Sequence, residues 1–263
     1  MLAGKVCIVT GSTAGIGKGI ARAFLQQGAE VFINGRSEAS VAATRAELAA
    51  EGWTLTHPAV ADLGSADGCE ALFAQVDQSG KEVDVLVNNM GIFETVDFFE
   101  ADDDKWLHYF NTNVMSTVRC CRKYLKGMLA RNRGRIIIVS SEAGLRPIAD
   151  MIPYSMTKSA QINIARGLAE LTKGTKVTVN SLLPGPTATE GVTTFVEGIA
   201  AKTNVSPEEA TAAYFVEREP TSLLQRFLRV EEIANMAMFM ASDMSSGMNG
   251  NAQLVEGGII RKM

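Results

Sequence analysis

The chain has 263 residues, of which 46% are hydrophobic and 21% charged, and its formal net charge is −4. This size and composition predict one large folded domain and exclude an intrinsically disordered chain. The charged residues are spread out and no apolar run approaches ~18 residues, so we expect no nucleic acid and no membrane as a partner. The N-terminal residues lack the regions of a signal peptide, and none is expected.

Cysteine content limits the possibilities further. The chain has four cysteines, Cys7, Cys69, Cys120 and Cys121. Their spacing matches no zinc-binding pattern, and we therefore predict no metal site. We interpret them as small buried residues of a protein in a reducing compartment, and we expect a cytoplasmic location.

Short apolar runs alternate with longer segments in which hydrophobic residues recur every three or four positions. The runs predict strands at 5–10, 31–34, 54–60, 83–87, 135–140, 176–182 and 252–255. The periodic segments predict helices at 15–27, 38–51, 66–78, 106–129, 154–171 and 231–240. Such alternation is typical of βαβ units. We therefore expect an α/β fold, with a doubly wound parallel sheet of about seven strands flanked by helices, in a single domain over residues 1–263.

Residues 187–229 form the least regular part of the chain. They follow the carboxyl end of a predicted strand, where open α/β sheets bind their ligands. We interpret this segment as a substrate-binding loop or lid.

The first predicted strand runs into T-G-S-T-A-G-I-G at 10–17 and then directly into a helix. Gly11 permits a tight turn, Gly15 lets the backbone approach a pyrophosphate, and Gly17 lets the helix pack closely against the strand. The free N–H groups of the helix N-terminus attract phosphates. This context favours a nucleotide site, although a glycine-rich loop without a ligand remains the alternative.

Tyr154 and Lys158 form a Y-x-x-x-K pattern within a predicted helix. Residues four apart lie on one face of a helix, one turn from each other. The lysine ammonium should lower the pKa of the phenol from about 10, so that the tyrosine exchanges protons near neutral pH. A solvated surface pair is the alternative reading of this pattern.

The spacing T-G-x-x-x-G-I-G, followed by Y-x-x-x-K, resembles the short-chain dehydrogenase/reductase family, and six segments in family order extend the resemblance from Thr10 to Gly258. It implies a Rossmann-like fold and hydride transfer between nicotinamide C4 and a carbonyl or secondary alcohol. It also implies a homo-oligomer, a tetramer or a dimer. A catalytically silent NAD(P)-binding regulator or scaffold, and an isomerase or dehydratase, are the alternatives on the same fold.

The resemblance implies four catalytic residues, namely Asn113, Ser141, Tyr154 and Lys158. Tyr154 would be the general acid/base, and Ser141 would hydrogen-bond the carbonyl oxygen as negative charge develops there. Asn113 would hold a water in a proton relay with Lys158. Ser140 is the alternative to Ser141, but its side chain would face the other way.

The resemblance also implies a set of cofactor-binding residues. Asp62 and Leu63 match the pair at the adenine ring, and N-N-M-G at 88–91 matches the segment on the adenosine side, with methionine in place of the usual alanine. The backbone of Thr187 and the hydroxyl of Thr189 would meet the nicotinamide carboxamide. The full set is Gly11, Ser12, Gly15, Ile16, Gly17, Arg36, Asp62, Leu63, Asn89, Gly91, Tyr154, Lys158, Pro184, Gly185, Thr187 and Thr189.

The end of the second predicted strand bears on the choice of cofactor. An acidic residue there would bind the ribose diol of NAD, but the family alignment places Gly35 at this position. The planar fork of the following Arg36 would suit a 2′-phosphate. We therefore expect NADP(H) in preference to NAD(H), although Ala14 stands where many NADP-preferring relatives carry a second basic residue. A solvated surface arginine is the alternative for Arg36.

The substrate is expected to be a small carbonyl compound or alcohol, enclosed by residues 142–152 and 187–229. Glu142 and Arg146 could contact a polar or charged group of the substrate, although a surface arginine before Pro147 is the favoured interpretation of Arg146. Apolar side chains in these segments would suit an apolar body, namely Met151, Ile152, Phe195, Val196, Ile199, Tyr214 and Phe215. The sequence does not identify the substrate.

Overall fold

The computed structural model describes residues 1–261 apart from the side chain of Phe195, so the predictions for that side chain and for residues 262–263 lie outside the described residues. Seven parallel strands form one sheet in the order β3-β2-β1-β4-β5-β6-β7. They are β1 (Val6–Val9), β2 (Glu30–Gly35), β3 (Thr56–Val60), β4 (Val85–Asn88), β5 (Arg135–Val139), β6 (Thr178–Pro184) and β7 (Ala252–Val255). The predicted fold class is confirmed.

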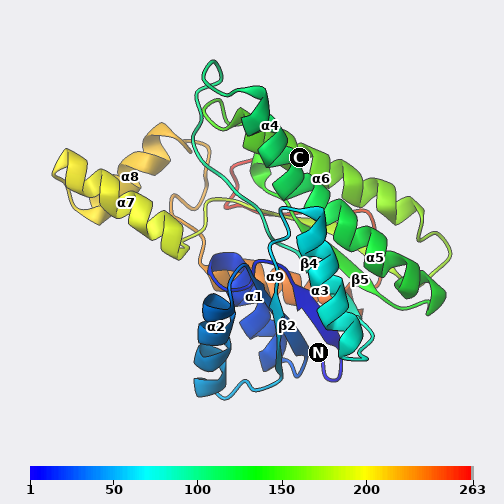
Figure 1. Cartoon of the computed structure of the whole chain (residues 1–263). Helices are drawn as coiled ribbons and strands as arrows, with labels where there is room; N and C mark the ends of the chain where they lie inside the picture. The colour runs from blue at the N-terminus through cyan, green and yellow to red at the C-terminus, as the bar shows by residue number, and fades with distance from the viewer. Residues whose placement is uncertain (262–263) are drawn as a thin grey trace.

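Helices cover both faces of the sheet (Figure 1). The core on one face includes α1, α2 and α9, and the core on the other includes α3, α5 and α6. The helices are α1 (Gly15–Gln26), α2 (Glu38–Ala50), α3 (Ala66–Gln78), α4 (Asp103–Tyr109), α5 (Ser116–Ala130), α6 (Ile152–Glu170), α7 (Glu190–Thr203), α8 (Pro207–Glu217) and α9 (Val230–Ala241). Among the helices of residues 1–261, none has the length and apolar composition needed to cross a bilayer.

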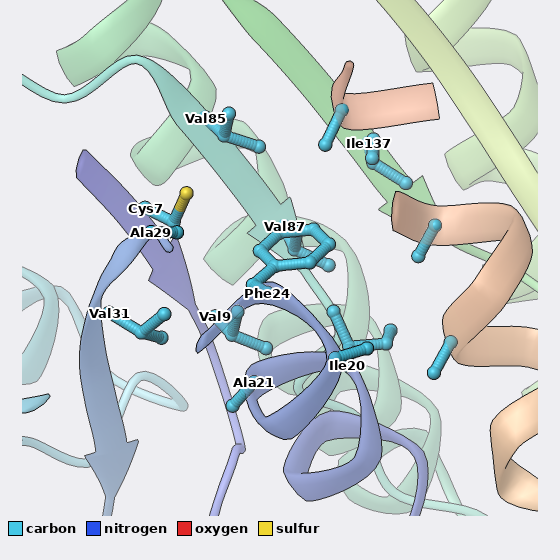
Figure 2. Packing of buried hydrophobic residues seen from close by; sticks show 14 of the residues in the cluster. Cys7, Val9, Ile20, Ala21, Phe24, Ala29, Val31, Val85, Val87 and Ile137 are labelled. Carbon is cyan, nitrogen blue, oxygen red and sulfur yellow. The ribbon is translucent and has the colours of Figure 1, made fainter. Parts of the chain in front are cut away.

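Figure 2 shows how α1 is held on the sheet. Ile20 and Phe24, one turn apart on α1, lie beside Val9 and Val87 of the central strands, and all four are fully buried. Burial of one such side chain stabilises a fold by about 1.5–3 kcal/mol. The contact therefore holds α1 against the central strands β1 and β4.

The strand order reverses beside β1, with β2 and β3 on one side and β4 to β7 on the other. Ligands of open parallel sheets bind at such a reversal, outside the carboxyl ends of the strands. Gly11, Asn89, Ser141 and Gly185 lie within two residues of the ends of β1, β4, β5 and β6. The topology thus brings four distant sequence segments to one edge of the sheet.

Residues 187–229 are more regular than the sequence analysis predicted. They contain α7 and α8, which form a hairpin that extends away from the sheet and its covering helices (Figure 1). Thr189 caps α7, and Ser206 and Glu209 form a reciprocal capping box at α8. The sequence S-P-E-E at 206–209 carries this helix-start signal, with proline at the first helical position.

Candidate active site

The glycine-rich turn after β1 has the geometry that its sequence implies. Gly11 and Gly15 have positive φ angles of +60° and +52°, a region that side-chain-bearing residues rarely adopt. A Cβ on Gly17 would lie 2.3 Å from the carbonyl oxygen of Gly11. The three glycines therefore allow the chain to turn sharply into α1 and leave the N–H groups of its first turn, which includes Ile16, at the sheet edge.

Side chains from neighbouring strands hold this turn in place. Asn34 at the end of β2 accepts a hydrogen bond from Gly11 N at 3.0 Å and donates to the carbonyl oxygens of Ala59 and Ala61. Asn89 Nδ2 donates to the carbonyl oxygens of Thr10 and Gly11 at 3.0 and 3.1 Å. The sequence analysis did not identify this role of Asn34. The only indication of it in the sequence is a polar side chain among the apolar residues of the predicted strand.

Some predicted cofactor residues do not present their side chains to the site. The Ser12 hydroxyl is buried and accepts from Asn34 N at 2.9 Å, while Leu63 packs in the core beside α3. The side chains of these two residues are therefore not presented at the sheet edge. Asp62 and Arg36 are exposed beyond the ends of β3 and β2. Within residues 1–261, Arg36 forms no side-chain hydrogen bond or ion pair.

The turn after β6 lies over the glycine-rich turn. Pro184 ends the strand, and a Cβ on Gly185 would lie 2.7 Å from the chain leaving β7. The Thr187 hydroxyl is buried and donates to the carbonyl oxygen of Gly185 at 2.8 Å. The Thr189 methyl lies 3.2 Å from the Cβ position of Gly15. Two predicted binding segments, far apart in sequence, are thus in contact.

A carboxylate of the chain lies at the N-terminus of α1. Glu190, the first residue of α7, accepts a hydrogen bond from Gly15 N at 2.9 Å and lies 3.3 Å from Lys18 Nζ. Hydrogen bonds from its own N–H and from Gly15, with Lys18 adding attraction, lower the pKa of Glu190. Lys18, Arg22 and Glu190 line a hollow of about 480 Å³. The sequence analysis did not single out Glu190.

Ser141, Tyr154 and Lys158 come together where β5 ends beside α6. Ser141 lies close enough to the Tyr154 phenol to lower its pKa. Lys158 is buried, its Nζ lies 5.4 Å from the centre of the Tyr154 ring, and it donates to the carbonyl oxygen of Val139 at 3.0 Å. Ser140 faces away and donates to the carbonyl oxygen of Lys158 at 2.7 Å. The serine beside the tyrosine is therefore Ser141.

The pKa values in this group differ from the sequence expectation. Burial, with repulsion from Glu142, raises the pKa of Tyr154, although nearby Ser141 lowers it in part. Burial lowers the pKa of Lys158 to about 8. The expected lowering of the tyrosine pKa by Lys158 is therefore wrong for the protein without a ligand, because the ammonium lies over the ring and burial dominates. The phenol is fully protonated at neutral pH.

Asn113 lies in a π-helical segment, Phe110–Met115, which interrupts the predicted helix between α4 and α5. Its side chain accepts from Ile92 N at 2.8 Å and donates to the Ile92 carbonyl oxygen and Thr157 Oγ1, both at 3.0 Å. Its carbonyl oxygen accepts from Gln161 Nε2 at 2.8 Å. Asn113 therefore fixes the chain that leaves β4 against α6.

A second group of charged side chains adjoins Ser141. Glu142 is 4% exposed, and Ser141 Oγ donates to its Oε2 at 2.5 Å. Glu219 is 3% exposed and pairs with Arg146. Burial, together with repulsion from Glu219, raises the pKa of Glu142 to about 7. The sequence analysis named Glu142 and Arg146 but missed Glu219, which lies 73 residues beyond Arg146.

The residues at this edge fit a dinucleotide cofactor. The sharp turn at 11–17 would hold a pyrophosphate against the start of α1, and exposed Arg36 would meet a ribose phosphate. A Cβ on Gly91 would lie 3.2 Å from Asn113 Oδ1 and 3.6 Å from Lys158 Nζ. This glycine keeps the approach to Lys158 open. Met90 packs against the core that includes α3 and α5, so its side chain has a place inside the protein.

Comparisons with known proteins agree with this geometry. A family model described as short chain dehydrogenase matches residues 5–200. The chain is 51% identical to the oxidoreductase YvrD of Bacillus subtilis over 259 residues, 98% of this chain and 97% of that protein. It is 32% identical to D-beta-hydroxybutyrate dehydrogenase of Cupriavidus necator over 260 residues, 98% of each chain.

Two solved structures extend the comparison. The L-sorbose reductase of Gluconobacter frateurii, complexed with NADPH and L-sorbose, has a TM-score of 0.93 and 28% identity and covers 100% of this chain and 98% of its own. A 3-oxoacyl-[acyl-carrier protein] reductase of Brucella melitensis with bound NAD has a TM-score of 0.84 and 28% identity, with coverage of 99% and 92%.

Proposed function

The chain belongs to the short-chain dehydrogenase family and is an oxidoreductase of the carbonyl-reductase type, and we propose that Tyr154, Ser141 and Lys158 handle the proton in its reaction. The predicted family and reaction class are confirmed. The proposed reaction is reduction of a ketone, or oxidation of the corresponding secondary alcohol, with Tyr154 as general acid or base.

The proton chemistry follows from the state of the three side chains. A bound nicotinamide supplies or accepts the hydride. In reduction, Tyr154 transfers its phenolic proton to the carbonyl oxygen while Ser141 donates a hydrogen bond to the same oxygen. The positive charge of Lys158, 5.4 Å from the tyrosine ring, favours the phenolate that remains. The alcohol then leaves, and Tyr154 is reprotonated from solvent.

One observation carries this proposal: Ser141, which follows β5, lies near Tyr154 and buried Lys158 of α6 at the carboxyl edge of the sheet. Burial keeps the Tyr154 phenol protonated at neutral pH, as a general acid must be. Nothing in this arrangement favours the catalytically silent alternative over turnover.

For the cofactor, we propose NADP(H), with NAD(H) as a second possibility. Exposed Arg36 directly follows β2, and within residues 30–37 the only acidic side chain, Glu30, is at the far end of the strand and pairs with Lys81. The complexes of the two solved relatives, one with NADPH and one with NAD, support this range of cofactors. The 2′-phosphate would meet the Arg36 guanidinium.

We also propose that residues 187–229 enclose the substrate, that the protein is a homo-oligomer and that it is cytoplasmic. Free, buried side chains at all four cysteines support a reducing compartment. Oligomerisation, as a dimer or tetramer, would use α5 and α6, and sedimentation equilibrium measures it.

A substrate panel tests the proposed function. Ketones and 3-oxoacyl compounds are screened with NADPH and NADH by nicotinamide absorbance, with the Tyr154→Phe variant beside the parent protein. We expect turnover by the parent, a loss of kcat of about 10²–10⁴-fold in Tyr154→Phe, and an unchanged Kd for NADPH. Substantial turnover by the variant would remove Tyr154 as the acid. Product formation without an absorbance change would favour an isomerase or dehydratase.

A further inference from the structure

The hydrogen of the Ser141 hydroxyl is already in use. Ser141 Oγ donates it to Glu142 Oε2 at 2.5 Å and accepts a hydrogen bond from Ala143 N at 3.1 Å. A serine hydroxyl has one hydrogen to donate and two lone pairs that accept. While Glu142 is ionised, it can only accept, so Ser141 has no hydrogen left for a substrate oxygen.

Protonation of Glu142 resolves this conflict. A neutral carboxyl donates its own hydrogen to Ser141 Oγ. Ser141 then accepts from Glu142 and from Ala143 N, which uses both lone pairs, and its hydrogen is free. Ser141 can then donate this hydrogen to the oxygen of a carbonyl compound or of a forming alkoxide.

The surroundings of Glu142 disfavour its charged form. The side chain is buried, and Glu219 repels its negative charge from the chain after α8. Lys158 on α6 acts in the opposite direction because its ammonium attracts the carboxylate. These opposing influences leave Glu142 able to change its protonation state near neutral pH.

Other polar groups face the same region. The negative charge of Glu142 helps to raise the pKa of both Tyr154 on α6 and Tyr214 on α8. Arg146 also lies near Tyr214, but it is paired with Glu219. Tyr154 keeps a raised pKa, so its ionisation is well separated from that of Glu142. Arg218 is bound to Asp150 at the rim.

We propose that Glu142 is a positioning residue that sets the direction of the Ser141 hydrogen bond, so that ketone reduction requires Glu142 in its protonated form. The inference rests on the proposed function, in which Ser141 stabilises the substrate oxygen. Ionisation of Glu142 turns the Ser141 hydrogen away from the substrate and withdraws that stabilisation. Loss of one such donor costs about 10²–10³ in kcat.

The test is the pH dependence of kcat/KM for ketone reduction at saturating NADPH, with the ketone that reacts fastest in the panel above. In the parent protein we expect kcat/KM to fall about tenfold per pH unit above a midpoint near Glu142's pKa. Glu142→Gln replaces the acid with an amide that donates at every pH. We expect the variant to lose the decline that begins near Glu142's pKa, so that any remaining decline begins only where Lys158 loses its charge near pH 8, and to exceed the parent protein's kcat/KM at pH 9.

A second variant tests the same group without touching Ser141. Glu219→Gln removes the negative charge that raises the pKa of Glu142, so the decline should move to lower pH. Glu217→Gln, at the exposed end of α8, is the matched control and should leave the decline in place. The carbonyl-stretch infrared band of a protonated carboxyl should disappear over the same pH range in the parent protein, and this change should be absent from Glu142→Gln.

The outcomes separate the two proposals. No ketone turnover in the whole panel, or an active Tyr154→Phe, overturns the proposed function. Turnover with the same decline in Glu142→Gln as in the parent protein overturns the role of Glu142 and leaves the function standing. If Glu142→Gln does not fold, two other results overturn the role of Glu142. One is a decline of kcat/KM with pH that Glu219→Gln does not shift. The other is a carboxyl infrared band that persists in the parent protein over the pH range of the decline.

Discussion

The backbone N–H of Gly15 donates a 2.9 Å hydrogen bond to the carboxylate of Glu190, which is 175 residues away in sequence. This N–H belongs to the helix N-terminus that would receive the cofactor pyrophosphate. Glu190 therefore places a negative charge where we propose that the pyrophosphate binds, and the two anions would compete for the same donor.

Removal of this charge should tighten cofactor binding. We expect Glu190→Gln to lower the Kd for NADPH roughly threefold to tenfold, because an anion at a helix N-terminus contributes on the order of 1 kcal/mol. Titration calorimetry at low and high salt measures the effect, which should shrink as salt screens the charge. Glu197→Gln, exposed on the same helix, is the control. A weaker or unchanged affinity for NADPH would show that Glu190 does not compete.

Arg36 should determine the preference between the two dinucleotides. Arg36→Ala should raise the Kd for NADPH about tenfold or more and leave the Kd for NADH within about twofold, because only NADPH carries the 2′-phosphate. Fluorescence titration with both cofactors checks this. Arg45→Ala is the comparison variant. It removes an arginine that donates hydrogen bonds to Thr56 of β3. An unchanged ratio of affinities would contradict the assignment of Arg36.

Gly17 should tolerate no side chain. A Cβ there would lie 2.3 Å from the Gly11 carbonyl oxygen and 2.5 Å from Asn89 Nδ2, so Gly17→Ala must move the turn. We expect a lower stability, by about 1–3 kcal/mol, and at least tenfold weaker NADPH binding. Urea unfolding and a cofactor titration measure the two effects. Gly191→Ala on α7, where a Cβ meets open space, should change neither. Normal NADPH binding by Gly17→Ala would overturn the proposed turn geometry.

Glu142 should make the folded protein less stable as the pH rises. Its pKa is raised from 4.5 in the unfolded chain to about 7 in the fold, so the folded state holds the proton more tightly. The contribution of Glu142 to the free energy of unfolding is therefore fully present below pH ~4.5. It is lost as the pH rises to about 7, by at most about 3 kcal/mol. In Glu142→Gln this dependence disappears, and the variant gains stability relative to the parent protein between pH 5 and pH 8. Urea unfolding at both values checks the sign.

The sequence predicted the parts of the site that depend on local spacing. The proximity of the glycines at 11–17, and that of Tyr154 and Lys158, could be predicted because a turn and a helix fix the distances between these residues. The alternation of strands and helices likewise predicted the sheet, since parallel strands need helical crossovers.

Contacts between distant segments were not readable in the same way. Nothing local brings Glu190 to Gly15 or Glu219 to Arg146, because these contacts arise only where the two ends of the α7–α8 hairpin join the rest of the fold. The pKa of Tyr154 was also missed, because burial outweighed the lysine one turn away. The helix α8, by contrast, could have been predicted, because Ser206 and Glu209 have the spacing of a capping box.

The hairpin of α7 and α8 is joined to the rest of the protein at neighbouring points. Thr187 pairs with Leu228, so the segment leaves and re-enters the fold at almost the same place. It also has a small apolar cluster of its own, built on Val196, Ala200 and Ala210. If, as we propose, this segment encloses the substrate, its replacement would change which compounds react and would leave Ser141, after β5, and Tyr154 and Lys158, on α6, in place.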